Sequence, residues 1–274
     1  MTVAIPETAW GCQFVPGLEG GCGFPAPNAS IFFTDPVFSL GPFNFTKPML
    51  LLWIGVAIIV IFFLYAFMRP KLVPRGAQNL GELGYLFIRD GIVKDVIGKG
   101  GTKFVPFLFS FFFLIWILNL FEVIPVAQFP PTSMFALPVA FALIVYFTWV
   151  PYGFIKQGPG FLKSMLFPSG IPWPMYFLLT PIELLSNFIV RPFTHAVRLF
   201  ANMFAGHLLL TTFAIAAWYL FNPASFSVVG VVGSAGSFLM LTILTAFEIL
   251  IGALQAYIFT LLTAVYLSDA VSGH

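Results

Sequence analysis

Three ionisable side chains, Arg198, His207 and Glu248, lie within long apolar stretches of this chain. On insertion scales, an arginine near the centre of a lipid bilayer costs about 2.5–3.5 kcal/mol, so an ionisable group in such a place is a functional candidate. An imidazole beside a carboxylate can accept and release protons near neutral pH. These residues therefore predict a proton-handling site, and the surrounding segments must bring them to matching depths in a membrane.

Two apolar segments carry these groups, and each is too long for one upright membrane span. Residues 174–221 and 228–269 would each extend well beyond the roughly 30 Å hydrocarbon core at about 1.5 Å per residue. Each segment could be two spans, but no polar loop divides either one. We therefore predict two long, strongly tilted helices that form an antiparallel hairpin.

The register of this hairpin brings polar groups to common depths. Residues at one depth of an antiparallel pair have numbers with a constant sum, and His207 with Glu248 gives 455, while Arg198 with Gln255 gives 453. We expect His207 and Glu248 to lie within hydrogen-bond reach, directly or through one water, because each is costly in lipid without a partner. The alternative is that this pair only holds the two helices together.

The first long helix has a polar face. At 100° per residue, one side of it collects polar residues together with the small Ala205. The polar residues are Glu183, Asn187, Arg191, Thr194, Arg198 and Asn202. His207 lies on the side opposite Arg198. On the second helix, Glu248 and Gln255 share a face, because seven residues make two turns.

The composition identifies the whole chain as an integral membrane protein. Of its 274 residues, 59% are hydrophobic and only 8% are charged, whereas an ordinary soluble domain has about 25% charged residues. A soluble globular enzyme, a disordered chain and a nucleic-acid binder with a basic patch are therefore excluded. Three histidines and two cysteines are too few for a rich metal or haem framework, so no cofactor and no metal site are predicted.

The predicted fold is all-α, with about five membrane helices and an amphipathic helix along the cytoplasmic face. Residues 1–47 are expected to form an extracytoplasmic segment, and residues 48–274 a single membrane domain. The expected elements are spans at 49–68, 104–124 and 134–155, an amphipathic helix at 78–98, and the two long helices at 174–221 and 228–269. Asn119 and Glu122 lie at the far end of the second span.

Basic residues set the expected orientation. Nine Lys or Arg fall in the segments that this topology places in the cytoplasm, and none falls in the two outer turns. Positive charge gathers on the cytoplasmic side of membrane proteins, so the N-terminus is predicted outside and the C-terminus inside. Cys12 and Cys22 would then face an oxidising exterior, where they either pair or remain free thiols, and both alternatives stay open.

Four short runs carry a family resemblance. They are RLFANMFAGH at 198–207, LQAYIF at 254–259, LLTAVYLS at 261–268 and NLFEVIP at 119–125. These runs resemble subunit a of the membrane sector of bacterial F-type ATP synthases, and the likeness covers roughly residues 45–270. It implies a multi-pass protein of the bacterial plasma membrane, surrounded by lipid. The implied partners are the ring of c subunits, the peripheral-stalk b subunits and the remainder of the ATP synthase, with no nucleic acid.

The resemblance also implies a mechanism. In this family, two offset aqueous half-channels reach the c ring from opposite sides of the membrane and couple proton flow to ring rotation and ATP synthesis. Arg198 resembles the essential arginine between them, whose fixed charge favours loss of the proton from the passing ring carboxylate. The implied proton path comprises His207, Glu248, Glu122, Asn119, Asn202, Gln255, Glu183, Asn187, Arg191 and Thr194. No catalytic site for ATP is expected in this chain itself.

Two other classes of membrane protein fit the sequence less well. A secondary transporter with a polar site at the membrane midplane is the runner-up, but such proteins are expected to contain an internal repeat, and no repeat relates the halves of this sequence. A haem cytochrome needs axial histidines on facing helices. His195 and His207 lie on one helix, which disfavours that class.

Overall fold

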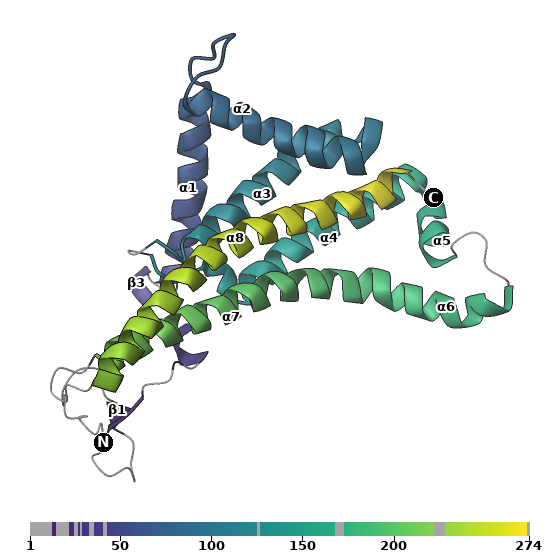
Figure 1. The fold of residues 1–274 in the computed structure, drawn as a ribbon. Helices are drawn as coiled ribbons and strands as arrows, with labels where there is room; N and C mark the ends of the chain where they lie inside the picture. Colours follow the sequence, from purple (N-terminus) through teal and green to yellow (C-terminus); the bar gives the residue numbers. More distant parts are fainter. Residues whose placement is uncertain are drawn as a thin grey trace.

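Helices dominate the computed structural model of the chain (Figure 1). It describes residues 13–14, 22–24, 27, 29–32, 36–40, 43–124, 127–167, 173–221 and 228–272. Five helices among these residues are long and apolar enough to cross a membrane: Lys47–Phe67, Thr102–Leu120, Ala136–Gln157, Met175–Leu220 and Val228–Val271. The predicted all-α membrane fold with about five membrane helices is confirmed.

The last two membrane helices form the long antiparallel hairpin that the sequence predicts. The first begins as α6 (Trp173–Leu185), passes through the π-helical turn η6 (Ser186–Val190) and continues as α7 (Arg191–Leu220). The second is the single helix α8 (Val228–Ser272). Helices α7 and α8 lie side by side and run obliquely to α1 (Figure 1). The end of the pair near Leu220 is called the closed end below, and the other is called the open end.

A proline explains the π-helical turn in the first long helix. Pro192 is the second residue of α7, which follows η6, and proline both lacks a backbone N–H and clashes with the carbonyl four residues before it. One wider turn absorbs this conflict without ending the helix, as π-turns do elsewhere. The turn also brings Asn187 into the protein interior, where only 2% of the residue is exposed.

The other helices differ in detail from their predicted ranges. The first span is α1 (Lys47–Phe67), and the third is α4 (Ala136–Gln157). The second, α3 (Val105–Leu120), ends four residues before the expected position, and a turn follows it. A residue before proline disfavours helical geometry, and Pro125 follows this turn in the sequence. Glu122 is therefore held in a turn and not on the span.

The amphipathic element consists of α2 (Ala77–Ile88) and the π-helical η2 (Arg89–Lys94). Its apolar side buries Ile88, Ile92 and Val93, while Asp90 forms ion pairs with both Arg89 and Lys94 on its outer side. These two partners lower the pKa of the Asp90 carboxyl to about 2. Helix α2 runs across one end of α1 (Figure 1), as expected for a helix that lies along a membrane face.

Aromatic and aliphatic side chains of α3 and α4 pack against α8 and form the core. Phe111 on α3 stacks on Phe259 of α8 at 5.7 Å, and Phe141 of α4 contacts both rings. Nearer the open end, Trp149 of α4 contacts Tyr266 and the short helix α5 (Gly160–Leu166) through Phe161. One side of the α7–α8 pair is thus fixed to the rest of the protein, and the other side carries no helix among the described residues.

The described part of the N-terminal region contains elements that the sequence did not predict. Short strands β1 (Gln13–Phe14) and β2 (Cys22–Gly23) pair in antiparallel fashion, as do β3 (Pro36–Leu40) and β4 (Phe43–Thr46). Between these pairs lies the 3-10 turn η1 (Ala29–Phe32). The proposed disulfide involves Cys12, which lies outside the described residues, so that question stays open.

Candidate functional site

A cavity of about 390 Å³ opens on the free side of the α7–α8 pair. We call it the arginine cavity, and the polar and small residues that line it are Arg198, Asn202, Ala205, Gly206, Glu248 and Gln255. The predicted pairing of Arg198 with Gln255 in depth therefore agrees with the structure. The face that helical periodicity assigned to Arg198, Asn202 and Ala205 is also the face that lines this cavity.

Arg198 is an exposed cation beside a hydrogen-bonded pair. The side-chain amide of Asn202 donates a hydrogen bond to Gln255 Oε1 at 2.8 Å, which ties α7 to α8 at this depth. Arg198 itself is exposed, and it forms no ion pair with any carboxylate of the described residues. Its charge is therefore free to act on a group outside this chain.

A second cavity, of about 400 Å³, lies closer to the closed end. We call it the histidine cavity, and its lining includes Ile31, Glu122, Gln128, His207, Thr211 and Thr245. The Nδ1 atom of His207 lies 3.9 Å from Glu122 Oε1. Glu122 is only 6% exposed, and this Oε1 atom has no hydrogen-bond partner. A buried acid and a base thus face each other across a gap slightly wider than a hydrogen bond.

Glu248 is buried in the neighbouring cavity without a partner for its Oε2 atom. The expected direct contact between His207 and Glu248 is not formed among the described residues, where the acid that pairs with His207 is Glu122. The constant sum of residue numbers predicted which residues of the two helices lie at the same level. It did not predict the direction in which each side chain points around its helix axis. Gly206 faces Glu248, and the next residue points about 100° away. Glu248 nevertheless remains close enough to Glu122 to interact with it electrostatically.

Asn119 joins α3 to α8 in the same region. Its side-chain amide donates to the carbonyl of Gly252 at 3.2 Å, and its Oδ1 accepts a hydrogen bond from Thr132 at 2.7 Å. The NH2 group and the oxygen of this buried amide each form a hydrogen bond inside the protein. Asn119 therefore fixes the position of α8 beside Glu122. Thr132 lies in the 3-10 turn η5 (Pro131–Ser133) and was not predicted, because a lone threonine between two spans gives no signal of this role.

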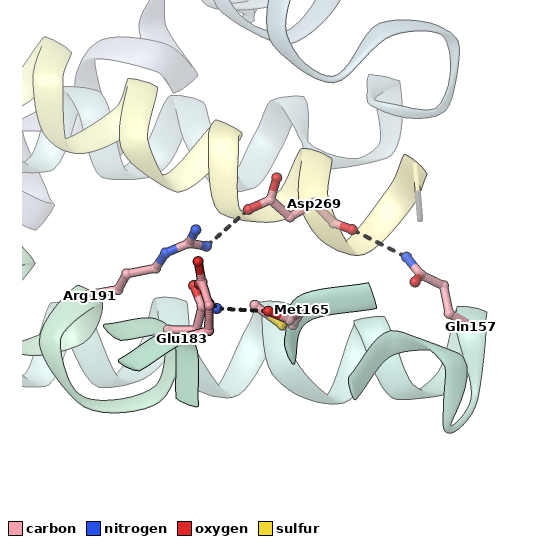
Figure 2. Close-up of polar contacts among 6 residues, drawn as sticks. Gln157, Met165, Glu183, Arg191 and Asp269 are labelled. Atoms are coloured by element: carbon pink, nitrogen blue, oxygen red, sulfur yellow. Dashed lines mark hydrogen bonds and ion pairs between the residues drawn. The ribbon is translucent and has the colours of Figure 1, made fainter. Parts of the chain in front are cut away.

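Polar residues also gather at the open end, and Figure 2 shows their arrangement. Arg191 Nη1 forms an ion pair with Asp269 Oδ2 at 3.0 Å, which links α7 to α8. Asn187 donates to Glu183 Oε2 at 3.0 Å and to the carbonyl of Met165 at 3.3 Å. Three residues of the predicted polar face, Glu183, Asn187 and Arg191, are thus brought together.

Of three further residues near these sites, Thr194 was predicted from the sequence, whereas Asp269 and His195 were not. Thr194 is exposed and donates to the backbone carbonyls of Val190 and Arg191 at 2.8 and 3.1 Å, so its hydrogen bonds stay within the first long helix. Asp269 was missed, although it closes the predicted α8 at nearly the depth of Arg191. His195 was also missed, and its ring lies on that of Phe259 with 3.9 Å between centroids. No group of three His, Cys, Asp or Glu that could hold a metal occurs in the part of the chain described.

Comparisons with known proteins assign this arrangement to a family. The family profile described as ATP synthase A chain matches residues 49–268. The chain belongs to the ATP synthase A chain family. ATP synthase subunit a of Streptomyces lividans is 48% identical over 258 residues, which are 93% of this chain and 90% of that protein. The corresponding subunit of Pseudarthrobacter chlorophenolicus is 43% identical over 231 residues, covering 83% and 85% of the two chains.

Membership of this family confirms the resemblance drawn from the four sequence runs. A more distant relative, ATP synthase subunit a of Hyphomonas neptunium, is still 41% identical over 234 residues, or 83% of this chain and 87% of that protein. The family match covers the whole lining of the arginine cavity, but it begins at Met49 and ends one residue before Asp269 of the open end. Ile31 of the histidine cavity therefore comes from a part of the chain that the family profile leaves out.

Proposed function

We propose that this chain is the proton-channel stator subunit of an F-type ATP synthase, coupling proton flow to rotation of a c ring. The observation that carries the proposal is the arginine cavity, where an exposed arginine without an ion-pair partner stands on a helix face that no other element of the described chain covers. A buried carboxylate on a ring of partner helices is the group that such a cation would serve. The small Ala205 beside it permits close helix approach.

The inlet of the proton path is assigned to the histidine cavity and to Glu248. Glu122 and Glu248 are buried carboxylates with unpartnered oxygens, and His207 on α7 lines the same cavity as Glu122. Positive charge in the loops favours an N-terminus outside and a C-terminus inside. The closed end then faces outside together with residues 1–47, and residues 48–274 form the membrane domain. A proton would pass from this inlet to the ring carboxylate beside Arg198.

The outlet is assigned to the open-end cluster. Glu183, Asn187 and Arg191 lie on the same helix as Arg198 and reach from its level toward the opposite end. Arg198 would stand between inlet and outlet, where a fixed cation repels protons that would otherwise leak straight through. The c ring, the b subunits of the peripheral stalk and the catalytic sector complete the assembly, and ATP chemistry belongs to that sector and not to this chain.

Removal of either inlet group tests this assignment. His207→Ala and Glu122→Gln are each expected to slow ATP-driven proton pumping in inverted membrane vesicles by roughly tenfold, because each removes one site for a proton in a single route. The double variant should be little slower than the worse single variant, since groups that act as one unit are not additive. Multiplied losses, or normal pumping by both single variants, would contradict a shared inlet. Thr242→Val is the matched control, because Thr242 is exposed and binds only its own helix.

The Arg191–Asp269 pair gives a test of the outlet. Loss of the Asp269 carboxylate frees Arg191 to pair with Glu183 (Figure 2), which would neutralise the outlet acid. Asp269→Asn is therefore expected to slow proton pumping several-fold while α8 stays in place, because Gln157 holds α8 through the backbone carbonyls of Asp269 and Ala270. Adding Arg191→Gln should recover part of the rate. A double variant that pumps more slowly than Asp269→Asn alone would contradict this account.

A further inference from the structure

A turn from the N-terminal region forms one wall of the histidine cavity. The 3-10 turn η1 (Ala29–Phe32) places Ile31 in the cavity lining, and Phe32 beside it is only 5% exposed. Phe32 belongs to the same buried cluster as the core residues of the membrane helices. This turn precedes residue 49, where the family match begins. The wall is therefore supplied by a segment outside the family profile.

Two phenylalanine rings contact the ring of His207, and a third packs behind one of them. Phe32 lies edge-to-face with the His207 ring at 5.4 Å between centroids and 65° between planes. Phe129 makes the same kind of contact at 5.7 Å and 69°. Phe32 is itself held by Phe204, on which it stacks at 4.5 Å and 26°. Edge-to-face contacts prefer a defined relative orientation, so these rings favour one orientation of the imidazole.

Aromatic contact is the main constraint on the direction of this imidazole. No hydrogen bond to the ring nitrogens of His207 occurs among the described residues, where only its backbone carbonyl accepts one, from Thr211 at 2.7 Å. The nearest acid, Glu122, lies 3.9 Å from Nδ1, which is beyond hydrogen-bond range. A rotation of the ring would move Nδ1 away from Glu122, and no polar bond would oppose it.

We propose that Phe32 is a positioning residue of the proton inlet: its ring holds the imidazole of His207 toward Glu122. This inference rests on the proposed function, because it deepens the role of the inlet. Phe32 acts through His207 and handles no proton itself. The charged groups that act on the imidazole are Glu122 in the turn after α3 and Lys47 at the start of α1. Glu122 belongs to the family match, whereas Lys47 and Phe32 precede it.

The test compares three changes at one position in the intact ATP synthase. Phe32→Tyr keeps the ring, Phe32→Leu keeps an apolar side chain without a ring, and Phe32→Ala removes both. Proton pumping is measured in inverted vesicles, and the reaction of His207 with diethyl pyrocarbonate is followed by mass spectrometry of the modified peptide. His195 is the internal reference, because it is 3% exposed and lies away from the inlet.

Phe32→Ala is expected to slow pumping by roughly tenfold and to raise the modification rate of His207 but not of His195. Phe32→Tyr should restore both values, and Phe32→Leu should restore assembly but not pumping. The matched control is Phe24→Ala, because Phe24 also contacts α7, through Tyr219 at 5.6 Å, but does not line the cavity.

Three results would overturn the proposal. One is a Phe32→Ala complex with normal pumping and normal His207 modification. Another is normal pumping by Phe32→Leu, which would show that Phe32 only fills space in the protein interior. The third is an equal defect in Phe24→Ala. If Phe32→Ala fails to assemble, the comparison of the leucine and tyrosine variants decides. Failure of the proposed function is recognised separately, because His207→Ala would then pump normally while the chemical modification of His207 still reports on Phe32.

Discussion

Replacement of Arg198 with alanine is expected to reduce ATP-driven proton pumping by at least about a hundredfold, the scale seen when one preorganised electrostatic group is removed. The subunit should still insert and assemble. Arg198 is exposed and forms no ion pair within the described chain, and the Asn202–Gln255 hydrogen bond that ties α7 to α8 does not involve it. Its loss would remove a charge that acts on a partner and no contact that holds this fold together. Pumping in inverted vesicles and the amount of assembled complex measure the two effects separately.

Arg198→Lys refines this test. Lysine keeps a positive charge, but its compact ammonium cannot reproduce the broad, permanently charged guanidinium, so pumping should stay far below normal. Arg69→Ala is the control, because Arg69 is an exposed arginine in the loop after α1 and lines neither cavity. Near-normal coupled pumping by Arg198→Ala would remove Arg198 from the role proposed for it, and a failure of Arg198→Ala to assemble would make the residue structural.

Gly206→Ala is expected to reduce proton pumping by roughly tenfold or more. A Cβ atom at Gly206 would lie 2.6 Å from Cδ of the Glu248 carboxyl group, a separation that real Cβ atoms essentially never show. The carboxyl group is the flexible end of its side chain, so the helices can stay in place while Glu248 swings away. The variant should therefore assemble normally and lose the position of an inlet acid.

A shorter acid gives a rescue experiment for this glycine. Glu248→Asp withdraws the carboxylate by one methylene, so the double variant Gly206→Ala with Glu248→Asp should pump faster than Gly206→Ala alone. Gly236→Ala is the matched control on α8, because no atom would lie within 4 Å of its added Cβ. Alanine in a helix interior is favoured over glycine by about 1 kcal/mol, so this control should be at least as stable as the parent. Normal pumping by Gly206→Ala would show that proton transfer does not depend on the position of the Glu248 carboxyl group.

The register of α7 against α8 was predictable from the sequence, whereas the direction of each side chain around its helix axis was predicted only in part. The hairpin and the level shared by Arg198 and Gln255 followed from segment length and antiparallel numbering, and both agree with the structure. The same arithmetic matched His207 with Glu248, but His207 turns toward Glu122 instead. The partner of His207 depends on how α3 and the turn after it pack against α7. The numbering argument considered only the two long helices, so it carried no information about that packing.

Tertiary contacts account for the residues that the sequence did not single out. Phe32 lies in a segment without helical periodicity, and one phenylalanine among 36 carries no pattern of its own. The ring of His195 packs on that of Phe259, and its Nε2 atom lies 3.4 Å from Oγ1 of Thr263. Both of these residues belong to the other long helix, α8. Asp269 is the exception, because its depth opposite Arg191 was available from the numbering. Asp269 was interpreted as the last residue of a helix and not as an ion-pair partner of Arg191.

The carboxyl end of α8 is fastened by side chains of α4. Gln157 donates to the carbonyls of Asp269 and Ala270, and Lys156 donates to the carbonyl of Val271. These carbonyls belong to the last turn, which has no partners within its own helix, and the lysine charge also suits the negative end of the helix dipole. In the proposed function, a ring that turns against the face of α7 and α8 would exert a sideways force on a helix 45 residues long. The hydrogen bonds at the end of α8 would pass that load to α4, so this subunit would resist torque without bending at its carboxyl end.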